Sequence, residues 1–239
     1  MLQIVPETGS TNADLSDALR GGEYLPEGHW LLADRQTAGR GRLGRTWFDG
    51  RGNFMGSGIV RAGHGDPPVA SLALVAGLAV QDALTGWLGR HADLRVKWPN
   101  DVLLDGAKIS GVLLEGVAGA VIVGIGVNLV AAPDVPDRAT TSLAAHGIDV
   151  SRDAFADALV RSFATELERW RLGGLAPLVR RWQSAAHPVG TPLRVIAPGE
   201  GPVEGTFAGL TEDGNLRLTL HDGSLRTIHA GDVDLPRPA

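Results

Sequence analysis

One segment, residues 71–87, limits the possible folds of this chain more than any other. It has helical periodicity and is almost wholly apolar, with Asp82 as its only charge. A helix that is apolar on every side has to be covered on every side by the rest of the protein. Its most apolar stretch, residues 72–80, is much shorter than the ~20 apolar residues of a membrane span. We therefore expect this helix to be buried at the centre of the fold.

The segments around this helix predict a mixture of helices and strands. Residues 153–171 and 175–184 also have helical periodicity. A shorter helix is expected after Ser10, because its hydroxyl oxygen can accept the free amide protons of a first turn. Asp105 and Gly106 favour a tight hairpin turn with positive φ between two short strands. Strand-like runs are found at residues 30–33, 53–61, 95–98, 102–104, 109–114 and 121–129.

The character of the chain changes near residues 187–190. The remainder consists of short β-type runs, separated by Gly, Asp and Pro turns, at residues 193–196, 203–210, 216–220 and 225–228. Such runs are typical of a small barrel of roughly five strands. A part rich in helices followed by an all-β part argues for two domains. We place these domains at residues 1–188 and 189–239.

Composition excludes several kinds of protein. The 239 residues contain no cysteine, which rules out disulfide scaffolds, thiolate zinc sites and cysteine nucleophiles. The formal net charge of −5 gives no sign of a nucleic-acid partner. The first residues have neither the basic nor the apolar region of a signal peptide. We expect a cytoplasmic protein with no membrane partner.

Residues 39–45, which we call the arginine loop, formally match the Gly-x-Gly-x-x-Gly fingerprint of dinucleotide-binding proteins. The residues that follow the loop cannot open the helix that would receive a pyrophosphate, so this interpretation fails. The loop and its flanks instead concentrate positive charge within seventeen residues, in Arg35, Arg40, Arg42, Arg45 and Arg51.

Guanidinium groups bind phosphate oxygens in a two-pronged geometry and keep their charge at all working pH values. The glycines between them allow close approach of the backbone to a ligand. Repulsion among the arginines predicts a loop that is disordered until an anion binds. The composition alone is equally compatible with a triphosphate site, a solvated basic loop and a nucleic-acid patch.

A second cluster is the segment Lys97-Trp98-Pro99-Asn100-Asp101, followed by Lys108 and Gly111 across the hairpin. A lysine ammonium here could neutralise charge that develops on a carboxylate or a phosphate. Asp101 could hold such a lysine in place or coordinate Mg²⁺. Lys97 and Asp101 could equally be ordinary strand ends, with Trp98 in the core. A third segment, residues 124–128, has the pattern of a buried strand that ends on the polar amide of Asn128.

Taken together, these motifs resemble the biotin protein ligases. The same segments occur in that family in the same order and at similar spacing: Ser10-Thr11-Asn12, Gln36 with the arginine loop and Trp47, residues 97–101, Lys108 with Gly111, and residues 124–128. The resemblance covers almost the whole chain. It implies an α+β fold, with a catalytic domain like those of class II aminoacyl-tRNA synthetases and biotin/lipoyl ligases. A small C-terminal SH3-like β-barrel would follow this mixed sheet with its helices.

The resemblance also implies a role for each matched residue. Biotin is expected to contact Ser10, Thr11, Asn12, Gln36, Arg40, Gly41, Arg42, Lys108 and Gly111. ATP or the adenylate is expected to contact Arg40, Arg42, Arg45, Trp47, Asn100, Lys108 and Asn128. Catalysis is expected to depend on Lys108, Arg40 and Asp101, with no metal held by protein side chains. Trp47 has a rival role as a core residue that anchors the loop.

The reaction that the resemblance implies is the ATP-dependent activation of biotin to biotinyl-5′-AMP, with Mg²⁺ accompanying ATP. Biotin is then transferred to a lysine of the biotin carboxyl carrier protein of a biotin-dependent carboxylase. The alternatives are a lipoate ligase or octanoyl transferase, and a non-catalytic module that binds nucleic acid or a carrier protein.

Two further expectations concern assembly and regulation. The chain begins almost directly at the catalytic domain, so we expect the monofunctional form of the ligase, without an N-terminal DNA-binding domain and without a DNA partner. A homodimer is compatible with the sequence if residues 121–127 lie at an exposed sheet edge. Residues 48–52 depart from the Ser-Pro found in many members of the family, beside the arginine loop.

Overall fold

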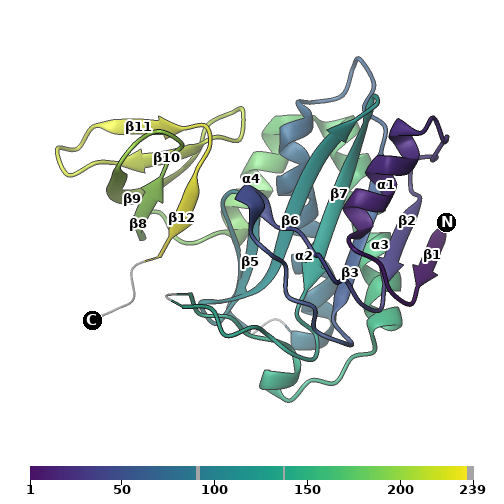
Figure 1. Cartoon of the computed structure of the whole chain (residues 1–239). Helices are drawn as coiled ribbons and strands as arrows, with labels where there is room; N and C mark the ends of the chain where they lie inside the picture. Colours follow the sequence, from purple (N-terminus) through teal and green to yellow (C-terminus); the bar gives the residue numbers. More distant parts are fainter. Residues whose placement is uncertain (90–91, 137, 236–239) are drawn as a thin grey trace.

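The computed structural model describes residues 1–89, 92–136 and 138–235, and contains two β-sheets (Figure 1). The larger sheet has the strand order β1-β2-β3-β7-β6-β5-β4. Only β1 and β2 run parallel, and the other neighbours are antiparallel. Its strands are β1 (Leu2–Val5), β2 (Trp30–Ala33), β3 (Phe54–Val60), β4 (Leu94–Lys97), β5 (Asp101–Leu104), β6 (Ala107–Val117) and β7 (Ala120–Val127).

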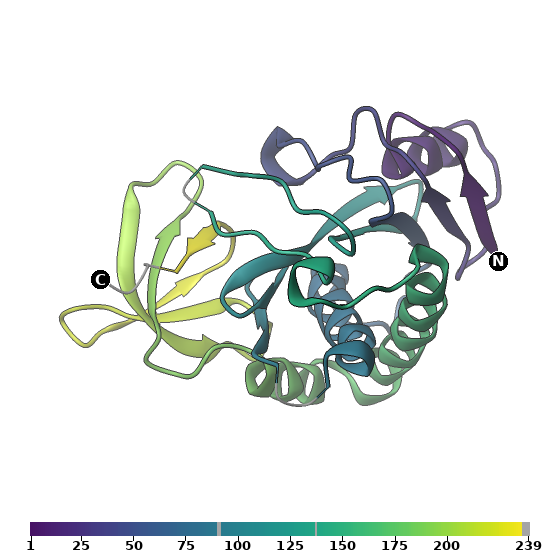
Figure 2. The ribbon, with the colours of Figure 1, turned by 90° about the horizontal axis from the view of Figure 1, so that it is seen from below.

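Helices cover both faces of this sheet, as Figure 2 shows. α1 (Thr11–Arg20) packs on one face, against β2, β3, β6 and β7. α2 (Leu72–Leu88) and α3 (Arg152–Gly173) pack on each other and on the opposite face, and α4 (Leu175–Ala185) packs beside them. The described residues also form the short 3-10 helices η1 (Arg42–Gly44), η2 (Val69–Ser71) and η3 (Ala144–His146).

The apolar helix lies in the core, as the sequence predicts. The stretch Val69–Leu88 is long and apolar enough to cross a membrane by length and composition, yet most of it is buried inside the fold. Leu72, Val75 and Leu84 have essentially no exposed surface. They belong to one large cluster that also contains residues from the sheet, from α3 and from α4. Burial on all sides explains why this helix carries almost no charge.

The C-terminal residues form an antiparallel sheet of five strands, with the order β11-β10-β9-β8-β12. Its strands are β8 (Pro192–Ile196), β9 (Pro202–Leu210), β10 (Leu216–Thr219), β11 (Leu225–Ile228) and β12 (Asp232–Asp234). A mixed sheet with helices followed by a β unit confirms the expected α+β class. The division at residues 188 and 189 and an SH3-like closure of the barrel remain predictions.

The hairpin that carries Lys108 also has the predicted turn. Asp105 and Gly106 join β5 to β6 with φ values of 50° and 78°. Positive φ at both central positions is the type I′ arrangement that matches the twist of the flanking strands. The turn places Lys108 on β6 opposite Leu103 of β5, close to the start of β5 at Asp101. The turn thus brings the Lys108 side chain within reach of Asp101, and their charged groups lie 2.6 Å apart.

Two expectations are wrong. Ser10 is the N-cap residue of α1, but within the described residues its side chain makes no capping hydrogen bond. The first free amide, that of Thr11, instead donates to Gln36 Oε1 at 2.8 Å. The second error concerns β7, which lies between β3 and β6 and so is not an exposed edge. Its two glycines, Gly124 and Gly126, make room for the side chains of Asn12 and Trp47 that pack on its face.

Candidate functional site

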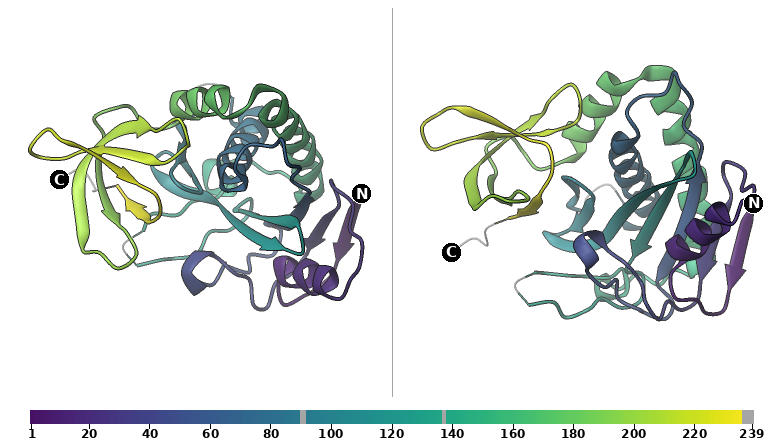
Figure 3. Two further views of the ribbon diagram at one scale, coloured as in Figure 1. Left: turned by 90° about the horizontal axis from the view of Figure 1, so that it is seen from above. Right: turned by 45° about the horizontal axis from the view of Figure 1, so that its top comes forward.

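A cavity of about 700 Å³ lies between α1, the face of the large sheet, the arginine loop and β12. Cavities of roughly 300–1,000 Å³ are typical of small-molecule sites. Figure 3 shows the arginine loop and the C-terminal sheet at the same side of the large sheet. Every residue that the sequence predicted for the site lines this cavity: Ser10, Thr11, Asn12, Gln36, Arg40, Gly41, Arg42, Arg45, Trp47, Asn100, Asp101, Lys108, Gly111 and Asn128.

The end of the cavity beside α1 is polar and built from uncharged side chains. The Thr11 hydroxyl lies 3.1 Å from Gln36 Oε1 and 2.7 Å from Ser57 Oγ. Ser57 donates to Asn12 Oδ1 at 2.5 Å, and Asn12 Nδ2 donates to Glu115 Oε2 at 2.6 Å. Thr11, Asn12, Gln36 and Ser57 are all buried. This end suits a neutral ligand with both donors and acceptors, because buried polar groups need partners.

Gln36 is held from the opposite side by Asp49. Asp49 Oδ1 accepts from the backbone N–H of Gln36 at 3.1 Å, and its Oδ2 accepts from Arg35 Nε at 3.1 Å. Asp49 belongs to the segment 48–52 that departs from the pattern of the ligase family. In this structure the departure therefore fastens the exit of the arginine loop to the strand end that carries Gln36.

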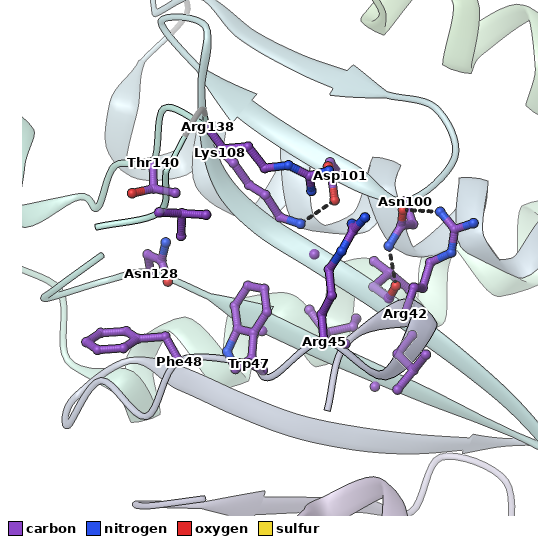
Figure 4. Close-up of a pocket in the computed structure, with 18 of the residues that line it drawn as sticks. Arg42, Arg45, Trp47, Phe48, Asn100, Asp101, Lys108, Asn128, Arg138 and Thr140 are labelled. Atoms are coloured by element: carbon purple, nitrogen blue, oxygen red, sulfur yellow. Dashed lines mark hydrogen bonds and ion pairs between the residues drawn. The ribbon is translucent and has the colours of Figure 1, made fainter. Parts of the chain in front are cut away.

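The buried carboxylate of Asp101 lies between two lysines at the other end of the cavity, and Figure 4 shows its contact with Lys108. Asp101 Oδ1 lies 2.6 Å from Lys108 Nζ, and its Oδ2 lies 3.1 Å from Lys97 Nζ. Burial would raise the pKa of Asp101, but the charges of Lys97 and Lys108 and their hydrogen bonds lower it far below its usual range. Asp101 is thus an ionised anchor for Lys108, and its engagement with two ammonium groups leaves it unsuited to holding Mg²⁺.

The arginine loop is tied to the C-terminal sheet. Arg42 donates to Asn100 Oδ1 at 3.0 Å and to the backbone oxygen of Gly231 at 3.3 Å. Arg45 forms an ion pair with Asp232 of β12. The same carboxylate lies 3.9 Å from Arg42 and 3.9 Å from Arg138. The sequence predicted a loop without order before an anion binds. The structure supplies an internal anion, Asp232, which offsets the repulsion among the arginines.

Trp47 packs flat against the glycines of two strands. A Cβ atom on Gly126 would overlap its indole ring, and one on Gly111 would lie 3.0 Å from it. Lys108 Nζ lies 5.7 Å from the ring centroid. Within the described residues Trp47 Nε1 and Asn128 Oδ1 are buried without hydrogen-bond partners. One unpaired donor and one unpaired acceptor in the same cavity wall point to a polar ligand there.

The sequence did not predict several polar residues of the cavity wall. Ser57, Arg138, Thr140 and Asp232 all line the cavity, and three of them lie far along the chain from the arginine loop. Ser57 could have been found as a polar residue inside a strand pattern that is otherwise buried. Arg138 and Thr140 lie in a Pro/Asp/Thr-rich loop whose backbone bonds to Lys108, since Lys108 N donates to Ala139 O at 2.8 Å. No sequence signal links Asp232 to the arginines.

Comparison with known protein families agrees with this geometry. The sequence profile of the biotin/lipoate A/B protein ligase family matches residues 8–129. A second profile, the biotin protein ligase C terminal domain, matches residues 190–235. The chain belongs to the biotin/lipoate A/B protein ligase family.

Similar proteins place it in the biotin branch of that family. The biotin–[acetyl-CoA-carboxylase] ligase of Paracoccus denitrificans is 39% identical and aligns over 90% of this chain and 92% of its own length. The enzyme of the same name from Mycobacterium tuberculosis is 36% identical over 97% and 88%. The biotin protein ligase from Aquifex aeolicus in complex with biotin and ATP has a TM-score of 0.84, with 29% identity over 99% of both chains.

These likenesses confirm the resemblance to biotin protein ligases and the fold class that it implied. They exclude neither of the two roles for Trp47, although its position against Gly111 and Gly126 shows that it is part of the cavity wall. The ligand contacts of the individual side chains remain predictions.

Proposed function

We propose that this protein activates biotin with ATP and transfers it to a specific lysine of a biotin carboxyl carrier protein. The observation that carries the proposal is the division of one cavity into two chemically different ends. One end is neutral and polar, as the ureido ring of biotin requires. The other end gathers Lys97, Lys108 and several arginines, as a carboxylate that meets a triphosphate requires.

The first step joins two anions. A carboxylate oxygen of biotin attacks the α-phosphorus of ATP in line, and the bond to the pyrophosphate oxygen breaks. The products are biotinyl-5′-AMP and pyrophosphate. Lys108 stands where the charge builds up, and Asp101 keeps its ammonium group in place at 2.6 Å. Arg42 and Arg45, which contact Asn100 and Asp232, face the phosphates, and Arg40 lines the same cavity. These cations offset the repulsion between carboxylate and phosphate.

The second step transfers biotin to the carrier. The lysine amine of the carrier attacks the carbonyl carbon of the mixed anhydride, an amide bond forms, AMP leaves and the amine loses a proton. Closure of the arginine loop would keep water from the anhydride. The adenine ring is placed beside Trp47 and Asn128, whose buried Nε1 donor and Oδ1 acceptor are unpaired within the described residues. Gly111 leaves room for Trp47 and Lys108, since a Cβ atom there would lie 3.0 Å and 3.1 Å from these two side chains.

Mg²⁺ enters this scheme with ATP. Within the described residues no group of three or more acidic or histidine side chains is placed to hold a metal ion. Asp101 is already paired with two lysines. The phosphates of ATP and water would therefore supply the oxygen ligands that Mg²⁺ prefers, and the ion would add positive charge beside the phosphates.

The transfer step requires a protein partner that supplies the acceptor lysine. The acceptor is a carrier domain of a biotin-dependent carboxylase, and the reaction takes place in the cytoplasm, where ATP is available. The net charge of −5 offers no electrostatic footprint for DNA, so the proposal contains no nucleic-acid partner and no membrane. If the protein forms a homodimer through a sheet edge, β1 or β4 is the strand that pairs, because they border the large sheet.

A single reaction tests the function. The purified protein is mixed with MgATP, biotin and a biotin carboxyl carrier domain, and the carrier is analysed by mass spectrometry. We expect one biotin mass increment on the carrier, and none when its acceptor lysine is replaced by arginine. A parallel reaction with lipoate in place of biotin separates the two branches of the family. Labelling with lipoate and not with biotin would contradict the proposal.

A further inference from the structure

We propose that Glu115 is a positioning residue for biotin, which orients the Asn12 amide and so sets the polarity of the hydrogen-bond chain that receives the biotin ring. The inference rests on the proposed function and assigns to it a residue outside the cavity wall. Gly111, Leu113 and Glu115 alternate along β6 and share one face of the sheet. Gly111 and Leu113 line the cavity, and Glu115 continues their row just beyond it.

The orientation of Asn12 follows from what its neighbours can donate. A carboxylate accepts hydrogen bonds and has none to give. The 2.6 Å contact with Glu115 Oε2 therefore belongs to Asn12 Nδ2, and Asn12 Oδ1 faces Ser57 Oγ at 2.5 Å. Because Asn12 is 4% exposed, an amide turned by 180° would place its oxygen against the carboxylate. Glu115 excludes that state.

The orientation of the Asn12 amide determines the direction of the next hydrogen bond, between Ser57 and Thr11, which lines the cavity. The single hydroxyl hydrogen of Ser57 is given to Asn12, so the 2.7 Å contact between Ser57 and Thr11 has to use the Thr11 hydrogen. The other acceptor near that hydrogen is Gln36 Oε1 at 3.1 Å. In either case the Thr11 hydroxyl has no hydrogen left for a ligand and can only accept one.

The resulting polarity matches a ureido group. Gln36 Oε1 already takes the backbone N–H of Thr11 at 2.8 Å, so its amide nitrogen is the part of Gln36 that has hydrogens to give. The wall thus offers an acceptor from Thr11 and a donor from Gln36, whereas a ureido ring has N–H donors and a carbonyl acceptor. A reversed Asn12 amide would send the Ser57 hydrogen to Thr11, so the Thr11 hydroxyl would accept from Ser57 and have one acceptor position fewer for a ligand N–H.

The backbone of β7 holds Asn12 from the other side. A Cβ atom on Gly124 would overlap Asn12 Oδ1. Gly124 is paired with Leu113 of β6 and with Ser57 of β3, so the three strands that carry this chain are in register at that point. Glycine at position 124 and glutamate at position 115 therefore serve the same side chain, one by leaving space and the other by fixing its direction.

The test compares biotin affinity with nucleotide affinity in four variants. Glu115→Met removes the acceptor and keeps the length of the side chain. We expect it to raise the Kd for biotin, measured by calorimetry without nucleotide, by about tenfold, which corresponds to about 1.4 kcal/mol. The KM for MgATP in biotin-dependent ATP–pyrophosphate exchange stays unchanged, because the arginine end of the cavity is untouched. A merely structural role for Glu115 would move both constants together.

Exchanging the amide of Asn12 and the carboxylate of Glu115 should restore biotin binding. Asn12→Asp alone places a second carboxylate against Glu115, and we expect biotin binding to fall further than in Glu115→Met. Adding Glu115→Gln supplies an amide donor between the two positions, while the new carboxylate still accepts from Ser57. The polarity of the chain is then restored, and the double variant should recover at least about tenfold of the lost affinity. A double variant that binds no better than Asn12→Asp would overturn the inference.

Asp14→Asn is the matched control on the same helix. Asp14 accepts from Thr8 at the exposed side of α1, so its replacement should leave both constants unchanged. Unchanged biotin binding in Glu115→Met would also overturn the positioning role, while the proposed function would stand. Wild-type protein that binds no biotin at all would instead refute the proposed function, and this inference with it.

Discussion

At the scale of single residues, the chemistry depends on how one carboxylate is shared. Asp101 is buried and ionised because two ammonium groups lie within 3.1 Å of it. A buried charge with a single partner would be costly, whereas two partners satisfy both oxygens. Lys97 also donates to the backbone oxygen of Val233 at 2.8 Å, so its position is fixed from β12 as well. Lys108 is the member of this group with more exposure to the cavity.

The first prediction concerns Lys108. Lys108→Ala should slow biotin-dependent ATP–pyrophosphate exchange by about 100- to 1,000-fold, the usual cost of removing one preorganised charge-stabilising group. Asp101 keeps Lys97 as its partner, so the protein should still fold, with a lower melting temperature because one oxygen of the buried carboxylate loses its partner. Lys97→Ala is the contrast, since it leaves Lys108 and Asp101 at 2.6 Å and should slow exchange by less than about tenfold. Equal losses in the two variants would argue that the lysines only stabilise Asp101.

At the scale of elements, β7 shapes the cavity because two of its alternate residues, Gly124 and Gly126, face the cavity and have no side chain. Gly124 makes room for Asn12 and Gly126 makes room for Trp47, and both belong to a strand that is paired on both sides. A strand in the middle of a sheet cannot shift without disturbing its neighbours, so an added methyl group has to displace the side chain above it. The two glycines therefore control different ends of the same cavity.

This arrangement predicts that two matched substitutions act on different substrates. Gly124→Ala should push Asn12 from its place and raise the Kd for biotin by about tenfold or more, with little effect on the KM for MgATP. Gly126→Ala should displace the Trp47 ring and raise the KM for MgATP instead. Calorimetry for biotin and exchange kinetics for MgATP separate the two effects. If both variants change both constants equally, the two glycines do not act on separate ends of the cavity, and the prediction is wrong.

The sequence predicted individual elements better than their arrangement in the sheet. The apolar helix, the Asp105-Gly106 hairpin and the strands that flank it were predictable, because periodicity and turn chemistry are local properties. The position of β7 was not, since strand order depends on contacts between distant segments. The same holds for the site. Fourteen matched residues line the cavity, whereas Glu115 and Asp232 act through partners that are far away in sequence.

At the scale of the whole molecule, the junction between the helical part and the C-terminal sheet contains a titratable group. His187 follows α4, and burial together with the charges of Lys97 and Arg95 lowers its pKa from 6.5 to about 4. Within the described residues its Nε2 atom is buried without a partner. The imidazole is thus neutral in the folded protein at neutral pH, and it takes up a proton more readily when the chain unfolds.

The lowered pKa of His187 makes the stability of the folded protein depend on pH. Above about pH 6.5 the histidine is neutral in both states and has no effect on stability. Between about pH 6.5 and about pH 4 the unfolded chain binds the proton first, so stability falls as the pH falls, with the full loss below about pH 4. We expect His187→Leu to show a smaller drop in melting temperature across this window than the wild type. Parallel curves for the two proteins would exclude His187 as the cause.

The C-terminal sheet can influence nucleotide binding through the contacts of Asp232 in β12 with the arginine loop. Asp232 is mostly buried and pairs with Arg45, while Arg42 and Arg138 lie 3.9 Å away. Each guanidinium has five donors, so a carboxylate behind it can fix its direction and still leave donors for phosphate oxygens. We therefore expect Asp232 to orient the arginines for ATP without competing with the phosphates.

Replacing Asp232 by Asn keeps the size of the side chain and removes its charge. We expect the KM for MgATP to rise by about tenfold while the Kd for biotin stays the same, because Thr11, Asn12 and Gln36 lie at the other end of the cavity. Combining Asp232→Asn with Arg45→Ala should raise the KM by much less than the product of the single effects, as expected of residues in direct contact. Asp234→Asn serves as the control, since this more exposed carboxylate has Arg138, at 3.7 Å, as its one ion-pair partner among the described residues, and exposed pairs contribute little. A KM for MgATP that falls in Asp232→Asn would mean that the carboxylate occupies the place of a phosphate, and that ATP has to displace the C-terminal sheet from the arginines before it can bind.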